Sequence, residues 1–132
     1  MRRILAACAA LLLTACGGHE VVVCGPCAGP GYVLTGLPDR VHHVRVTVCL
    51  SGQACRTGTV REPLHLDGLQ YLALPSGASW EDYDGRSLRV TVRSRHGRWH
   101  GAGTLDYRAP DGSPCDCGSL AADVPLTFTT SG

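Results

Sequence analysis

Lysine and asparagine are absent from the 132-residue chain, and isoleucine, phenylalanine and methionine each occur once. Without lysine there can be neither a phosphate-binding P-loop lysine nor a Schiff-base lysine, which excludes the enzyme classes that depend on those groups. Aromatic residues make up only 5% of the chain, and no apolar run is long enough to span a bilayer.

The first fifteen residues have the pattern of a secretion signal. Arg2 and Arg3 precede a short apolar run over residues 4–13. The next residues, Leu13-Thr14-Ala15-Cys16, resemble the lipobox of bacterial lipoproteins. The resemblance implies cleavage before Cys16 and lipidation of its thiol, so that palmitate-type acyl chains anchor the protein outside the cell membrane. Arginine without lysine is also what GC-rich codons produce, which predicts a GC-rich bacterium.

We therefore expect three parts: a signal peptide over 1–15, a lipidated tether over 16–22 and one domain over 23–132. Loss of the signal peptide removes two of the twelve arginines and none of the eleven acids. Nucleic-acid binding depends on basic residues that neutralise phosphates. The near-neutral mature chain thus predicts no nucleic-acid partner. The expected lipid predicts the membrane as a partner, and the identity of any protein or small-molecule partner is left open.

Cysteine is the most informative residue type that the chain does contain. Of eight cysteines, Cys8 leaves with the signal peptide and Cys16 takes the lipid. In an oxidising extracytoplasmic space the remaining six predict three disulfides. The six are Cys24, Cys27, Cys49, Cys55, Cys115 and Cys117.

Local spacing narrows the disulfide pairings. Cys49 and Cys55 flank a turn-like segment, which predicts a bridge across a hairpin. The other four cysteines are expected to tie the start of the domain to a long loop over residues 108–123, which is rich in turn formers. Which of Cys24 and Cys27 meets which of Cys115 and Cys117 stays open.

Short runs of alternating apolar and polar residues predict strands, and no segment has sustained helical periodicity. The clearest runs are 44–48 and 88–93. Seven strands in all suit an all-β fold, an antiparallel immunoglobulin-like β-sandwich braced by disulfides. Weaker candidate strands are 31–36, 54–60, 69–74, 99–107 and 124–129.

The segment 31–38, with the strand and hairpin that follow it, is similar to the opening of small bacterial immunoglobulin-like or carboxypeptidase-regulatory-like sandwich domains. This likeness covers about thirty residues. It implies the sandwich fold and carries no function with it, because such folds host many functions.

Cys24-Gly25-Pro26-Cys27 has the four residues of the thioredoxin active-site motif. That chemistry needs the first cysteine at a helix N-terminus, where the helix dipole lowers the thiol pKa. Here Ala28-Gly29-Pro30-Gly31 follows and would break a helix. A thiol-disulfide oxidoreductase using Cys24 and Cys27 is therefore the alternative to a structural role for these cysteines.

A metal-binding lipoprotein is the second alternative. Cys24, Cys27, Cys115 and Cys117 could form a thiolate zinc site, but oxidation after export argues against it. Adjacent His42 and His43 would point to opposite faces of a strand, and arginines flank His96. We expect no metal or other cofactor.

The main hypothesis is a non-enzymatic surface lipoprotein with a binding or structural role in the cell envelope. Neither the G-x-S-x-G nor the H-E-x-x-H motif is present, and no catalytic residue is predicted. The expected binding surface consists of Trp80, Tyr83 and Trp99, because aromatic side chains carry much of the energy of recognition.

Overall fold

Strands form where the sequence alternates apolar and polar residues, because one face of each strand is buried and the other is wet. The computed structural model describes residues 21–38, 41, 43–61 and 66–129, and these contain nine strands and one short 3-10 helix. The elements are β1 (Gly31–Thr35), β2 (Val44–Leu50), β3 (Arg56–Val60), β4 (Gly68–Tyr71), η1 (Trp80–Tyr83), β5 (Ser87–Ser94), β6 (Gly97–Thr104), β7 (Asp106–Arg108), β8 (Ser119–Pro125) and β9 (Thr127–Thr129).

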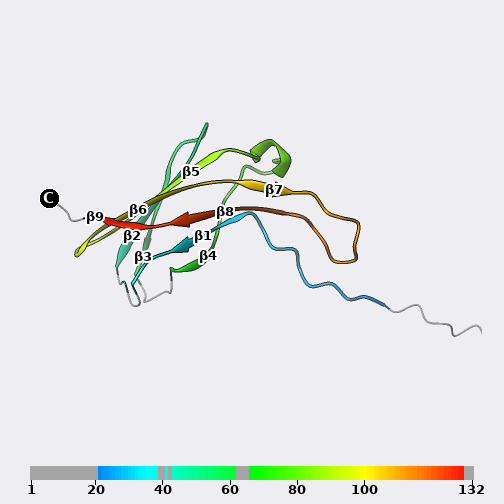
Figure 1. The fold of residues 1–132 in the computed structure, drawn as a ribbon, viewed down its shortest axis with the longest axis horizontal. Coiled ribbons are helices and arrows are strands. Elements are labelled where there is room, and N and C mark those ends of the chain that lie inside the picture. The colour runs from blue at the N-terminus through cyan, green and yellow to red at the C-terminus, as the bar shows by residue number, and fades with distance from the viewer. Residues whose placement is uncertain (1–20, 39–40, 42, 62–65, 130–132) are drawn as a thin grey trace, which may run out of the picture.

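Two sheets pack face to face around one core (Figure 1). Sheet A has the order β4-β1-β8-β7, and sheet B has the order β3-β2-β5-β6-β9. The predicted all-β, disulfide-braced sandwich is confirmed. One pairing differs from the antiparallel expectation, since β1 and β8 run parallel from Gly31 opposite Ala121 to Thr35 opposite Pro125. These two strands are far apart in sequence, so no tight turn has to join them.

Two of the seven predicted strands divide because they pass from one sheet to the other. The predicted strand 99–107 is interrupted at Leu105, and 124–129 is interrupted at Leu126. The antiparallel register continues without a shift from one sheet to the other. It pairs Trp99 with Phe128 in sheet B and Tyr107 with Leu120 in sheet A. A single long hairpin therefore contributes strands to both sheets.

The expected loop over 108–123 was too long, because β8 begins at Ser119. Residues Leu120, Ala122 and Val124 are buried on alternate positions of β8 and form part of the core. Residues 119–123 form part of a strand because apolar and polar residues alternate there, whereas the turn-forming residues lie before Gly118.

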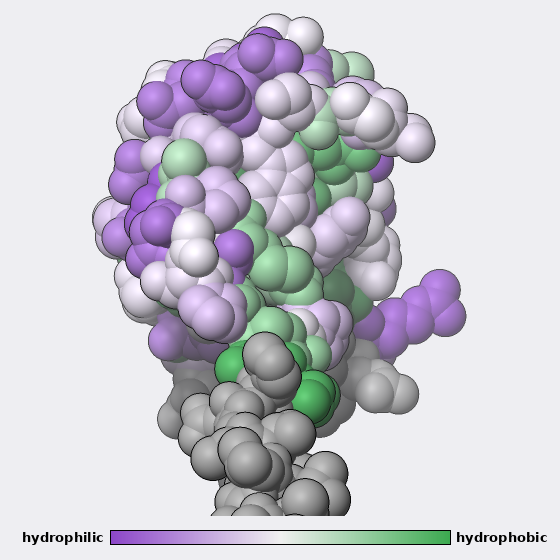
Figure 2. All heavy atoms as spheres, turned by 90° about the vertical axis from the view of Figure 1, so that its right-hand side faces the viewer, coloured by the Kyte–Doolittle hydropathy of each residue, from purple (hydrophilic) through white to green (hydrophobic). Residues whose placement is uncertain are grey.

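The segment before β1 is an extended arm that lies beside the loop between β7 and β8 (Figure 1). Val21, Val22 and Val23 in this arm are 85%, 56% and 86% exposed. Figure 2 views the molecule from this end and shows hydrophobic residues gathered in the lower part of the coloured surface. The expected signal peptide, Cys16 and most of the tether lie outside the described residues.

Candidate functional site

The six cysteines of the domain form three disulfides. Cys24 pairs with Cys115, and Cys27 pairs with Cys117, with Cα–Cα distances of 5.1 and 5.9 Å. The third bridge joins Cys49 to Cys55 across the β2–β3 turn, as predicted. The structure thus resolves the pairing that the sequence left open.

Cys24 and Cys27 are bridged to other residues and not to each other. No helix follows them, since residues 21–29 form no regular element and remain exposed. The motif therefore lacks both the internal disulfide and the helix N-terminus that thiol exchange by a thioredoxin-type site requires. Here the two cysteines fasten the N-terminal arm to the β7–β8 loop.

The β7–β8 loop is also held by a charged network around Asp116. The Arg108 guanidinium donates two hydrogen bonds to the two Asp116 carboxylate oxygens, at 2.9 and 2.8 Å. The backbone N–H groups of Asp111 and Gly118 donate two more. The bonds from Arg108, followed by those from the backbone, hold the pKa of Asp116 well below its usual range. The loop therefore keeps a charged, fully engaged carboxylate beside its two disulfides.

The aromatic residues expected to form a binding surface occupy different places. Trp99 and Tyr83 are each 7% exposed, and Trp80 is half-buried against the core. Trp99 packs on Phe128 with ring centroids 5.2 Å apart, near the β5–β6 turn. Tyr83 precedes the start of β5, at the other end of that strand. The structure does not bring the three together as one exposed surface.

Tyr83 instead links two parts of the fold. Its hydroxyl accepts a hydrogen bond from Gln53 Nε2 at 2.9 Å, and the Arg86 guanidinium stacks over its ring at 4.4 Å. Gln53 belongs to the turn closed by the Cys49–Cys55 bridge. Tyr83 therefore fixes the β2–β3 hairpin against η1.

A recess of about 110 Å³ opens where the two sheets end side by side. Its walls come from β3 and β4, the edge strands of sheets B and A, and from the strands next to them. The lining residues are Tyr32, Val48, Leu50, Gln53, Ala54, Arg56, Tyr71, Leu72 and Ala73. The recess therefore has an apolar floor and a few polar groups at its rim, as small-ligand sites commonly do.

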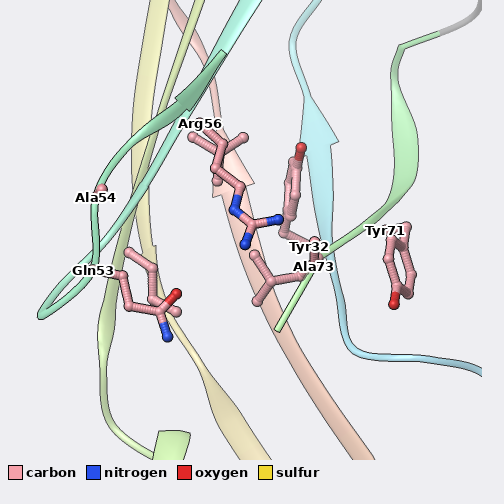
Figure 3. A pocket seen from close by; sticks show the side chains of 9 residues that line it. Tyr32, Gln53, Ala54, Arg56, Tyr71 and Ala73 are labelled. Carbon is pink, nitrogen blue, oxygen red and sulfur yellow. The ribbon is translucent and has the colours of Figure 1, made fainter. Parts of the chain in front are cut away.

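Arg56 reaches from β3 toward the ring of Tyr32, and Gln53 borders the recess from the β2–β3 turn (Figure 3). Tyr32 is only 6% exposed, and burial raises the pKa of its hydroxyl. The hydroxyl therefore stays neutral at physiological pH, and the Arg56 guanidinium supplies the positive charge of the recess. An anionic group of a ligand would find its partner there.

Arg56 and Tyr32 are not among the site residues predicted from the sequence. Arg56 lies opposite Val48 and Val60 lies opposite Val44, so both point to the inner side of sheet B. The alternation of side chains from Arg56 to Val60 could have shown that Arg56 faces inward, because residues two apart in a strand share a face. An arginine on the inner side of an edge strand is also a known way of discouraging edge-to-edge pairing.

Among the residues that the structure describes, no group of three or more His, Cys, Asp or Glu side chains is placed to hold a metal ion. His42 lies outside those residues. Over the same part of the chain, no helix has the length and apolar character needed to cross a membrane. No protein-family model, curated protein or solved structure matches this chain.

Proposed function

We propose that this protein is a membrane-anchored lipoprotein of the cell envelope that acts by binding and not by catalysis. Three disulfides support an oxidising, extracytoplasmic location. Two of them fasten the arm that follows the expected lipidation site, so the domain is held firmly at the end from which a lipid tether would leave.

The observation that carries the binding role is the recess between β3 and β4. Apolar side chains of Val48, Leu50 and Leu72 form its walls, and the Arg56 guanidinium stands at its rim. This arrangement suits a small ligand, or the end of a chain, with a short apolar body and a carboxylate. The apolar body gains from leaving water, and the carboxylate forms charge-assisted hydrogen bonds with arginine.

Short-chain carboxylates test this proposal. Hexanoate is expected to bind more tightly than hexanamide, and Arg56→Gln is expected to remove that preference, a loss of about tenfold for the acid. Binding can be followed by NMR shifts of the residues that line the recess. Arg61→Gln is the matched control, because it removes the same charge from an exposed residue just beyond β3 that does not line the recess.

Equal binding of the acid and the amide would contradict the role of Arg56. Binding of neither compound would remove the recess as a site for this class of ligand.

The anchor is tested separately through Cys16→Ala. Without the thiol no lipid can be attached, so the variant is expected to lose fatty-acid labelling. Molecules whose signal peptide has been removed are expected to leave the membrane fraction after carbonate washing. Metabolic labelling with a palmitate analogue and fractionation of whole cells measure both effects. Labelling that persists in Cys16→Ala would contradict the predicted anchor. Cys8→Ala is the control, because Cys8 lies in the expected signal peptide and its loss should leave labelling unchanged.

A further inference from the structure

Charge is distributed unequally between the two sheets. The strands of sheet B contain Arg45, Arg56, Arg89, Arg93 and Arg98 and no Asp or Glu. The strands of sheet A contain Asp106 and Asp123 with a single arginine, Arg108. The chain as a whole is near neutral, so the positive charge of sheet B results from the fold and not from composition.

Three of these arginines form a row across sheet B. Arg45 on β2 lies directly opposite Arg93 on β5, which lies directly opposite Arg98 on β6. All three are exposed, and their neighbours Val44, Val92 and Trp99 face the core, so the row lies on the outer face. Neighbouring strands are about 4.8 Å apart, which makes the row about 10 Å wide.

Like charges at directly opposed positions destabilise a sheet. No Asp or Glu lies on the strands of sheet B to offset them, and no ion pair to the three arginines occurs within the part of the chain that the structure describes. A bound anion would relieve this repulsion. Guanidinium groups are suited to the task, since each can donate two parallel hydrogen bonds to a phosphate, sulfate or carboxylate.

The surroundings of the row are polar and rich in hydroxyl groups. Thr59 and Thr129 extend the row at its two ends. The next row consists of Thr57, Thr47, Thr91, His100 and Thr127. Phe128, the exposed aromatic residue of β9, pairs with inward-facing Trp99 and so belongs to the other face. The outer face therefore offers charge and hydrogen bonds but no aromatic platform.

We infer that the arginine row Arg45, Arg93 and Arg98 is a docking site for a linear anionic polysaccharide. Single-stranded nucleic acids are usually held by stacking on aromatic side chains, and protein partners by buried aromatic and apolar anchors; this face has neither. The row lies toward the β5–β6 turn, at the end opposite the N-terminal arm, which also directs it away from lipid headgroups at the proposed anchor (Figure 1). A hydrated polymer that carries phosphate, sulfate or carboxylate groups matches the charge and the hydrogen-bonding groups of this face.

The test uses the full-length protein in a neutral detergent and measures affinity at several salt concentrations. The probes are dextran phosphate, heparin and polygalacturonate, which carry phosphate, sulfate and carboxylate respectively, with neutral dextran as the blank. Arg93→Gln, at the centre of the row, is expected to weaken binding of the preferred polymer about tenfold and to reduce the salt slope by about one. Arg93→Lys keeps the charge but loses the paired N–H groups of the guanidinium. Its affinity for the polymer is expected to lie between those of the parent and of Arg93→Gln.

Arg89→Gln is the matched control. Arg89 lies on the same strand and the same face and carries the same charge, but it is opposite Cys49 and Ala102 and so outside the row. Loss of the Arg89 charge is expected to weaken binding of the polymer by less than about threefold. The thermal midpoint of Arg93→Gln without polymer should equal or exceed that of the parent, because a like-charge contact is removed. This measurement separates lost binding from lost folding.

Equal losses of affinity in Arg93→Gln and Arg89→Gln would overturn the assignment of binding to the arginine row and would indicate attraction by the overall charge of the face. Failure of all three polymers to bind, tighter binding to oligothymidylate, or a preference for phosphatidylglycerol over phosphatidylcholine vesicles that Arg93→Gln abolishes would overturn the polysaccharide. The row is separate from the recess lined by Arg56, so this inference goes beyond the proposed ligand site. Its failure would leave the hexanoate and Cys16 experiments unaffected.

Discussion

Removal of both long-range disulfides, with Cys24, Cys27, Cys115 and Cys117 all changed to serine, is expected to lower the free energy of unfolding by about 6 to 7 kcal/mol. The bridges join residues 91 and 90 positions apart, and closing one loop of that length restricts the unfolded chain by about 4.5 kcal/mol. Domains of this size have total stabilities of only about 5 to 15 kcal/mol. The quadruple variant should therefore lose about half or more of the domain's stability, and it should unfold if the parent is stable by less than about 7 kcal/mol.

Removal of one of these bridges alone should cost far less. While Cys27–Cys117 remains, Cys24–Cys115 closes only the small ring formed by the few residues between the neighbouring cysteines, which contributes about 2 kcal/mol. The same holds with the roles exchanged. Guanidinium-induced unfolding of the two pair variants and of the quadruple variant measures this cycle.

The Cys49→Ser/Cys55→Ser pair variant is the control, because that bridge closes a six-residue separation and should also cost about 2 kcal/mol. If the quadruple variant loses no more than the sum of the two long-range pair variants, the two bridges do not share one loop. A Cys24–Cys27 bridge found by mass spectrometry of the native protein would contradict the pairing directly.

The second large effect is expected at Gly103, where Gly103→Ala should destabilise the domain by about 3 kcal/mol. Gly103 lies on β6, where the long hairpin passes from sheet B to sheet A. A Cβ atom at this position would overlap the backbone carbonyl oxygen of Asp123 and approach Val124. A backbone oxygen in a strand cannot move aside as the end of a flexible side chain can, so β6 and β8 would have to separate.

Gly58→Ala is the matched control for this prediction. Gly58 also lies within a strand, β3, but an added Cβ there would meet no atom within 4 Å. Alanine reduces the freedom of the unfolded chain relative to glycine, so this variant should be unchanged or more stable by about 0.5 kcal/mol. Thermal unfolding of both variants measures the difference. An unchanged midpoint in Gly103→Ala would show that the two strands do not approach as closely as described.

The sequence by itself determined the fold class and the positions of most strands. Alternation at residues 44–48 and 88–93 fixes which side chains face the core, because successive residues of a strand point to opposite sides. The Cys49–Cys55 bridge was predictable because the two cysteines are only six positions apart and a turn between them brings them together. The lipid anchor at Cys16 also depends only on a local pattern, and it stays a prediction.

Tertiary structure alone decided which distant residues meet. Alternation placed Arg45 and Arg93 on outer faces, but only the strand register set them opposite each other and beside Arg98. The pairing of Cys24 with Cys115, the passage of one hairpin between both sheets and the burial of Trp99 and Tyr83 likewise follow from the way the sheets pack. A local pattern specifies the face of a strand, whereas neighbours across a sheet are specified by register and by packing of the whole core.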